Sequence, residues 1–293
     1  MSKLQFRYPN AIVSTDWLAD NINAPDLRVF DCTTYLNYNA KSKQPYDVTS
    51  GWSDYNQSHI PGATLLDIQR DLSDNDNPYL FAIPNVEDLA IAFARQGVSN
   101  ESRVILYARD NPQWATRVWW MLNYIGFDNA AILDGGIIKW GQERRAISSG
   151  HEHYAPASLS TNARREVFVG KNDVLDAIKN DNYCTISALS PDLHSGKNPR
   201  YGRCGRIPAS INVPAVCLVN SQDTSLISPQ DASAVFGNAG ASASQKIITY
   251  CGSGIWAAMN AFVLYQLGYD NVAVYDNSMS EWASDINLPV EVD

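Results

Sequence analysis

Apolar residues follow two alternating patterns along the chain. Short runs rich in β-branched residues predict buried strands, and longer segments with one apolar face predict helices. The predicted strands include Arg103–Tyr107, Ala130–Leu133, Lys246–Tyr250 and Val272–Tyr275, and the predicted helices include 86–96 and 255–267. Strands and helices that alternate in this way favour an α/β fold, in which a mostly parallel sheet is flanked by helices on both faces.

The chain also repeats itself. Residues 122–140 match residues 264–282 at a constant offset of 142, and residues 59–62 match residues 206–209 at an offset of 147. The offset grows toward the N-terminus, which indicates extra loop residues in the first copy, the largest insertion being the polar stretch 33–58. We therefore expect two tandem copies of one α/β fold.

Composition sets the expected domain boundaries. Residues 146–165 are polar and contain Ser, Gly and Pro, which is typical of a linker. The sequence predicts one domain over 1–145 and a second over 166–293, each long enough to bury its own core.

Charge and hydropathy exclude several classes of protein. The 293 residues are 45% apolar and 18% charged, which favours a packed fold over disorder. A formal charge of -9 opposes nucleic-acid binding, because phosphates need cationic partners. The apolar stretches are far shorter than the roughly 20 residues of a membrane span, and the first ten residues do not resemble a secretory signal. We expect a cytoplasmic protein with no nucleic-acid or membrane partner.

Cysteine and histidine usage bears on the cellular compartment and on metal binding. The five cysteines form an odd set without Cys-x-x-Cys pairs, which suits reduced thiols in a reducing compartment. His151 and His153 are close in the chain, but two ligands in a linker are too few for a metal site. We expect no metal.

Residues 247–258, Ile-Ile-Thr-Tyr-Cys-Gly-Ser-Gly-Ile-Trp-Ala-Ala, carry the candidate chemistry. A buried strand runs into Cys251, a Gly-Ser-Gly turn follows, and a helix begins. A thiol there faces backbone amides and the positive end of a helix dipole, which stabilise the nucleophilic thiolate. Gly252 and Gly254 give the amides room to form an anion-binding nest. The alternative is an inert buried cysteine before a glycine turn, and spacing alone leaves both readings open.

Other reaction classes lack a required residue in this loop. A Cys-x5-Arg phosphatase needs a guanidinium where this chain has Ala257, and a nucleotide-binding P-loop needs Gly-Lys-Ser/Thr where it has 254–256. A cysteine protease needs a histidine base, and of the four histidines only His59 lies in a motif shared by the two halves.

Several motifs together resemble those of two-domain rhodanese-type sulfurtransferases. They are His-Ile-Pro-Gly at 59–62, Arg-Val-Trp-Trp-Met at 117–121, Leu-Asp-Gly-Gly at 133–136 and Cys-Gly-Ser-Gly-Ile-Trp-Ala at 251–257. The resemblance covers nearly the whole chain. It implies two tandem rhodanese-like domains, of which the second carries the nucleophile and the first is an inactive copy, with Ala108 where the second has Cys251.

The resemblance also implies the chemistry. Cys251 takes a sulfane sulfur from a small donor, holds it as a persulfide and passes it to a thiol or cyanide acceptor or to a thioredoxin-like reductant, without a dissociable cofactor. The loop amides would stabilise the charge of the persulfide. The implied donor-binding residues are Arg200, Gly252, Ser253, Gly254, Ile255 and Trp256.

The form of the loop bears on the donor. Thiosulfate enzymes of the family have Cys-Arg-Lys-Gly, whereas 3-mercaptopyruvate enzymes have Cys-Gly-Ser-Gly, as this chain does. One family arginine matches Arg200, but Leu189 stands in the place of the other. Arg203 or Arg206 would be replacements, with a solvated basic loop as the alternative reading.

Three alternatives stay open at this stage. The first is a thiosulfate:cyanide sulfurtransferase, and the second is a low-turnover persulfide carrier or regulatory rhodanese module. The third concerns mechanism: the resemblance suggests a Ser-His-Asp constellation of Ser253 and His59 with Asp47 or Asp54, while a structural role for His59 is the simpler interpretation.

Overall fold

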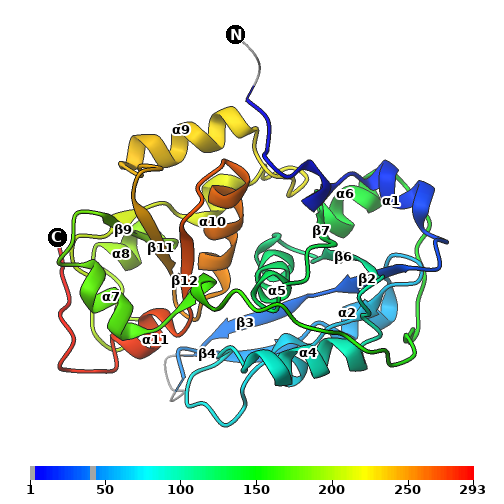
Figure 1. The fold of residues 1–293 in the computed structure, drawn as a ribbon, viewed down its shortest axis with the longest axis horizontal. Helices are drawn as coiled ribbons and strands as arrows, with labels where there is room; N and C mark the ends of the chain where they lie inside the picture. The colour runs from blue at the N-terminus through cyan, green and yellow to red at the C-terminus, as the bar shows by residue number, and fades with distance from the viewer. Residues whose placement is uncertain (1–3, 40–43) are drawn as a thin grey trace.

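A computed structural model describes residues 4–39 and 44–293 of the chain. Residues 1–3 and 40–43, which fall within the predicted first domain, lie outside the described residues. Two five-stranded sheets, each entirely parallel, form the centres of the two halves (Figure 1). The predicted α/β fold class is confirmed.

The two sheets have equivalent strand orders. The first is β1-β7-β6-β2-β5, with β1 Ile12–Val13, β2 Leu27–Asp31, β5 Thr64–Leu65, β6 Arg103–Tyr107 and β7 Ala130–Leu133. The second is β8-β12-β11-β9-β10, with β8 Phe168–Val169, β9 Tyr183–Ser187, β10 Ile211–Asn212, β11 Lys246–Tyr250 and β12 Val272–Tyr275. Because each position in one order has its counterpart in the other, the sequence repeat is a repeat of the fold.

Helices cover both sheets. Those of the first half are α1 Thr15–Asn21, α2 Trp52–Gln57, α3 Ile68–Asp71, α4 Val86–Arg95, α5 Gln113–Tyr124 and α6 Gly136–Gln142, with a 3-10 turn η1 at Pro9–Ala11. Those of the second half are α7 Lys171–Ala177, α8 Pro191–His194, α9 Pro229–Ala239, α10 Ile255–Gln266 and α11 Ser278–Trp282, with η2 at Arg165–Val167 and η3 at Ala215–Leu218. The predicted helices at 86–96 and 255–267 are α4 and α10.

Helices α5 and α10 pack against each other between the two sheets (Figure 1). Every residue of α5 and nearly every residue of α10 is buried. This is expected for α10, which is apolar on nearly all sides, whereas α5 also buries polar residues such as Arg117. Trp119 meets Phe262 edge to face at 4.9 Å between ring centroids, and Trp120 meets Tyr265 at 6.2 Å. One hydrophobic core therefore continues across both halves, and the two tryptophans lie at the domain interface.

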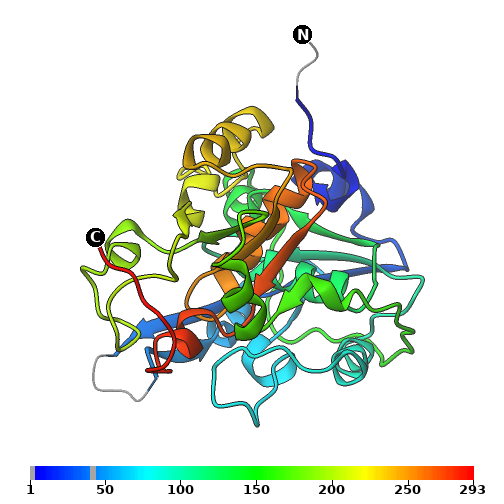
Figure 2. The same ribbon diagram turned by 60° about the vertical axis from the view of Figure 1, so that its left-hand side comes forward.

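The polar insertion of the first copy folds into more than a loop. It forms an antiparallel hairpin, β3 Thr34–Tyr38 with β4 Tyr46–Ser50, followed by α2. Figures 1 and 2 both show this hairpin reaching from the first half past α5 toward α11 of the second. The insertion thereby brings residues of the first half to the second half.

The segment between the halves has little regular structure. From the end of α6 at Gln142 to η2 at Arg165, all residues are described, and they form no helix or strand apart from an isolated bridge between Ser148 and His59. Within the described residues, no helix combines the length and the apolar character needed to cross a bilayer.

Candidate functional site

The loop Cys251 to Gly254 lies at the carboxyl end of β11. This strand is the central one of the second sheet, so the loop emerges where parallel sheets place their ligands. Cys251 is buried, with 1% of its surface exposed. Gly254 has a left-handed backbone with φ +73° and caps α10. A side chain there is excluded, because a Cβ would lie 2.7 Å from the Asp276 carbonyl oxygen.

Helix α11 fixes the direction of the loop peptides. The amides of Met279 and Ser280 donate to the carbonyl oxygens of Cys251 (3.1 Å) and Gly252 (2.9 Å). In the part of the chain that the structure describes, no acceptor is found for the amides of Gly252, Ser253, Ile255 and Trp256. Unpaired amides at the start of a helix form a binding site for an anion.

Ser278 is the side chain that ties the two ends of this loop together. Its Oγ accepts hydrogen bonds from the amides of Cys251 (3.0 Å) and Gly254 (3.2 Å) and donates one to the Tyr275 carbonyl oxygen (2.7 Å). Ser278 has φ +50°, a conformation that is unfavourable for a residue with a side chain. Such a strained conformation persists only where the surrounding structure enforces it. The packing around Ser278 therefore helps to fix the geometry of the loop from Cys251 to Gly254.

A cavity of about 630 Å³ covers Cys251. The second half lines it with the predicted residues Arg200, Gly252, Ser253, Ile255 and Trp256, and also with Leu189 and Tyr201. The first half lines it with the β3–β4 hairpin and with residues 110, 111, 113 and 114. The cavity therefore brings together all the predicted donor-binding residues except Gly254. Gly254 instead shapes the backbone of the loop, because it caps α10 in a left-handed conformation.

The cavity holds unpaired polar groups. Arg200 is its one cationic lining residue and Asp110 its one anionic residue among those described. The Arg200 guanidinium lies 5.3 Å from the Tyr38 ring centroid, and its Nε is buried without a hydrogen-bond partner. Ser253 Oγ is also buried without a partner. Buried polar atoms in folded proteins are normally paired, so these two point to a ligand.

Arg203 and Arg206 do not enter the cavity, contrary to the suggestion that they replace the missing family arginine. Arg203 donates to carbonyl oxygens at and after the end of α11, those of Trp282, Ala283, Asp285 and Leu288, at 2.7 to 2.9 Å. Arg206 forms ion pairs with Glu291 and Asp293 near the C-terminus. Both guanidiniums are thus bound elsewhere, and Arg200 is the one cation among the described residues that line the cavity together with Leu189.

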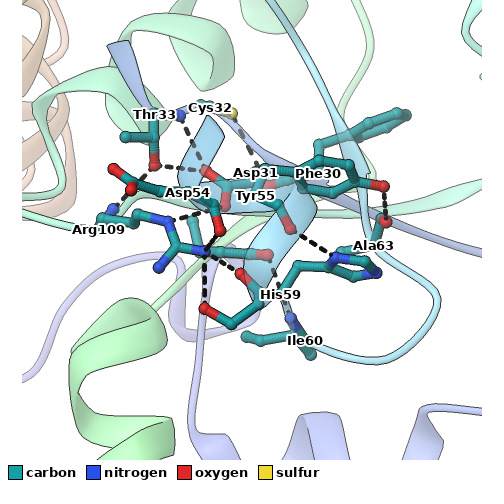
Figure 3. A network of polar contacts seen from close by, with 12 residues as sticks. Phe30, Asp31, Cys32, Thr33, Asp54, Tyr55, His59, Ile60, Ala63 and Arg109 are labelled. Atoms are coloured by element: carbon teal, nitrogen blue, oxygen red, sulfur yellow. Dashed lines mark hydrogen bonds and ion pairs between the residues drawn. The ribbon is translucent and has the colours of Figure 1, made fainter. Parts of the chain in front are cut away.

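His59 belongs to a network within the first half (Figure 3). Its ring stacks on Tyr55 at 4.3 Å between centroids, and its Nδ1 bonds the Tyr55 carbonyl oxygen at 2.9 Å. His59 does not line the cavity that contains Ser253, nor do Asp47 and Asp54. The structure therefore does not assemble the suggested Ser-His-Asp constellation.

The first half has no free nucleophile at its equivalent strand end. Arg109, next to Ala108, points toward Asp31, 3.8 Å from Nε to Oδ2, and donates to the carbonyl oxygens of Asp54 and Ser58 (Figure 3). Burial raises the pKa of Asp31. The nearby Cys32 thiol is fully buried, and burial raises its pKa well above the ordinary value. A thiol that resists ionisation is a poor nucleophile.

Sequence reasoning missed three residues of the site. Tyr46 and Tyr201 line the cavity and hydrogen-bond each other, and Ser278 holds the loop. The aromatic and β-branched run Thr34–Tyr38 was a signal for the hairpin that carries Tyr46. Nothing in the sequence pattern pairs Tyr46 with Tyr201.

Comparison with known proteins defines the class. The rhodanese-like domain family matches residues 14–143 and 171–285, so the chain belongs to this family, and its two halves are two rhodanese-like domains. It is an enzyme of the sulfurtransferase class. These findings confirm the predicted family and enzyme class.

The particular relatives cover almost the whole chain. The 3-mercaptopyruvate sulfurtransferase of Escherichia coli K12 is 32% identical, over 95% of this chain and 97% of its own. The thiosulfate sulfurtransferase of Rattus norvegicus is 28% identical, over 93% and 91%. The crystal structure of SseA from Escherichia coli superposes with a TM-score of 0.79 at 29% identity, over 92% of this chain and 98% of that one.

Proposed function

We propose that the protein transfers a sulfane sulfur from 3-mercaptopyruvate to a thiol or cyanide acceptor through a persulfide on Cys251. The observation that carries this proposal is the charge of the site. The loop after Cys251 has no cationic side chain, and Arg200 is the single cation among the described lining residues. One guanidinium matches one carboxylate, whereas a thiosulfate dianion profits from more than one cation. The identity of 32% to a 3-mercaptopyruvate sulfurtransferase supports the same donor.

The proposed first half-reaction needs no cofactor. The Cys251 thiolate attacks the donor sulfur, an S–S bond forms as the C–S bond breaks, and the electron pair passes to the donor carbon. That carbon takes up the thiol proton, and pyruvate leaves. The unpaired amides of Gly252, Ser253, Ile255 and Trp256 and the Ser253 hydroxyl would stabilise the negative persulfide, while Arg200 would hold the carboxylate.

The proposed second half-reaction restores the enzyme. An acceptor thiol attacks the outer sulfur, the persulfide S–S bond breaks, and the Cys251 thiolate re-forms while the acceptor leaves as a persulfide. Cyanide would leave as thiocyanate by the same displacement. A thioredoxin-like dithiol is a further proposed acceptor. In this scheme residues 166–293 form the catalytic domain, 1–145 the inactive copy and 146–165 the linker.

The test measures sulfur transfer by the purified chain with 3-mercaptopyruvate and with thiosulfate, each with cyanide or a small thiol. Cys251→Ser should abolish transfer, and Cys204→Ser, which removes an exposed thiol outside the cavity, should not. Arg200→Ala should raise KM for 3-mercaptopyruvate by about 10- to 100-fold, because a hydrogen bond to a charged group is worth roughly 1.5 to 3 kcal/mol. The kcat should fall less, because the carboxylate is held equally in ground and transition states.

Three outcomes would contradict the proposal. Full activity of Cys251→Ser would mean that Cys251 is not the nucleophile. A higher kcat/KM for thiosulfate would mean that loop charge does not select the donor. A single equivalent of sulfur transferred without turnover would favour a carrier, for which the apolar Leu189 in the cavity wall is the structural argument.

A further inference from the structure

Two phenols, one from each domain, meet over the catalytic loop. Tyr46 comes from β4 of the first domain, and Tyr201 follows Arg200 in the second. Their hydroxyl oxygens are 2.9 Å apart, and their rings meet edge to face with centroids 6.2 Å apart. Neither residue belongs to a motif that carries the family resemblance.

Both phenol oxygens lie directly beside the loop. A Cβ on Gly252 would collide with both of them, so the absence of a side chain at this position is what lets the phenols approach. The Ser253 hydroxyl, buried and unpartnered, lines the same cavity. In the described structure neither phenol forms a hydrogen bond to Cys251 Sγ. The polar groups therefore surround a space next to the sulfur rather than the sulfur itself.

The outer sulfur of a persulfide would extend into this space. An S–S bond is about 2.05 Å long, so the second sulfur lies that much farther from the Cys251 backbone. A hydrogen-bond donor that falls short of Sγ can reach this second atom. Ser253 Oγ, which is buried and faces Tyr46, adds a third hydroxyl to this polar space.

The two phenols have one hydroxyl proton that their mutual hydrogen bond does not use. Two phenols carry two protons, and their mutual hydrogen bond uses one of them. Burial raises the pKa of Tyr46 to about 12 and the pKa of Tyr201 well above its ordinary value, and negative charge on Cys251 acts in the same direction. Both phenols therefore stay protonated at neutral pH, and the second proton is free for a ligand.

We propose that Tyr46 and Tyr201 are further catalytic residues, which together donate a hydrogen bond to the outer sulfur of the Cys251 persulfide. The proposal rests on the proposed function, since it needs a persulfide on Cys251. No proton leaves either phenol, because the donor thiol supplies the proton that the departing carbon takes up. The negative charge that builds up on the outer sulfur, as the C–S bond breaks, gains the hydrogen bond.

The pair gives an unusual pattern on mutation. In Tyr46→Phe or Tyr201→Phe the remaining phenol loses its mutual partner but keeps a proton for the sulfur. The double variant has no phenol donor left. We expect each single variant to slow persulfide formation by about 3-fold, and the double variant by about 100-fold, within the range for loss of one oxyanion donor. Phenylalanine keeps the edge-to-face packing, and Tyr269→Phe, a half-buried phenol outside the cavity, is the matched control.

The experiment follows two reactions of the full chain. Single-turnover loading with 3-mercaptopyruvate measures persulfide formation, with mass spectrometry to place the sulfur on Cys251. Iodoacetamide alkylation measures the free thiol, and its rate and pH profile should stay within about twofold of the wild type, because the phenols do not bond Sγ. A distorted loop would change both reactions, whereas loss of a donor to the outer sulfur changes only the first.

A second arm does not depend on the donor. Inorganic polysulfide loads Cys251 directly, since the thiolate displaces a shorter polysulfide, and the lifetime of the persulfide is then followed without acceptor. The double variant should hold its persulfide for about a tenth as long as the wild type, and the single variants for an intermediate time. This arm remains informative if 3-mercaptopyruvate proves to be the wrong donor.

Equal persulfide formation and lifetime in wild type and double variant would overturn the proposal. So would equal losses in alkylation and persulfide formation, which indicate a structural role. If the double variant does not fold, the single variants decide, and wild-type persulfide lifetimes in both would refute the assignment. Failure of the wild type to load from either source would instead refute the Cys251 persulfide.

Discussion

Replacing Arg117 by Met tests how the first domain supports the loop that follows Cys251. Arg117 lies in α5, is fully buried, and crosses the domain interface to form an ion pair with Asp276 at 2.6 Å. It also donates to the Phe81 carbonyl oxygen at 2.8 Å, and its guanidinium lies 4.9 Å from the Phe168 ring centroid. Its Nη1 would lie 2.8 Å from a Cβ on Gly254, at the start of α10.

The expected loss of stability follows from what the substitution leaves behind. Asp276 would keep one hydrogen bond, from the Ile83 amide at 2.7 Å, but its other oxygen would be a buried charge without a partner. Breaking such a pair costs about 3 to 5 kcal/mol. Nε and Nη1 of Arg117 are already unpartnered in the described structure, which places the expected value near the lower end. At roughly 2 to 4 °C per kcal/mol, Tm should fall by about 6 to 12 °C.

Arg7→Met is the matched control for this measurement. Arg7 also pairs with an aspartate, Asp270, but the two side chains are 42% and 71% exposed, against 0% and 10% for the buried pair. An exposed pair contributes little, so its loss should give no resolved change in Tm. Arg117→Met combined with Asp276→Asn should recover part of the loss, because the unpaired charge is removed.

Urea unfolding and thermal melting at pH 7 measure these effects. The reasoning would be refuted if Arg117→Met lost less than about 1 kcal/mol, or no more than Arg7→Met, since burial would then not distinguish the two pairs. It would also be refuted if the double variant were less stable than Arg117→Met alone.

Substitutions at three further positions test the site and its surroundings. Gly252→Ala should slow persulfide formation by at least about 10-fold in a single-turnover assay, because a Cβ collides with both phenols. Gly237→Ala, whose Cβ meets nothing within 4 Å, is its control and should gain about 0.5 to 1 kcal/mol in urea unfolding. Ser278→Gly and Ser278→Ala both remove the hydroxyl that binds the amides of Cys251 and Gly254, so both should lower kcat/KM. Because glycine also relieves the strain of φ +50°, Ser278→Gly should have a higher Tm than Ser278→Ala. Burial lowers the pKa of His194 from 6.5 to about 4 in the folded chain. As the pH falls below 6.5, the imidazole is protonated in the unfolded chain but not yet in the folded one, so the free energy of unfolding decreases until the pH reaches about 4. His194→Gln should remove about 1 kcal/mol of that loss in urea unfolding at pH 7 and 4.5, after allowance for solvent screening, and the exposed His153→Gln should not.

The fold could be predicted because its signals are local or repeated, and the proposal of Cys251 as the nucleophile rests on a local signal as well. The recurrence at an offset of 142 gave two copies of one topology, and the strand order of the two sheets agrees. Cys251 stands between a buried strand and a glycine turn, and each of these neighbours in sequence fixes part of its position. The resemblance then supplied the chemistry, which spacing alone left undecided.

The errors and omissions involve long side chains and distant pairs. Arg203 and Arg206 lie near the turn that flanks the site, but an arginine reaches far, and their guanidiniums bind carbonyl and carboxylate groups elsewhere. Tyr46 and Tyr201 are 155 residues apart, and only the folded hairpin brings them together. Arg117 sits in an apolar run with no sequence sign that it is a fully buried cation.

These contacts give the first domain a role at the site, although its own strand end carries Ala108. The second domain by itself supplies Cys251, the loop amides and Arg200, but one wall of the cavity is the β3–β4 hairpin of the other copy. The same copy supplies Tyr46 beside Gly252 and Arg117 beside Gly254, so it contacts the loop at two points. A copy whose own strand end carries Ala108 thus encloses and positions the proposed nucleophile of the other copy, and this role does not require a cysteine at its strand end.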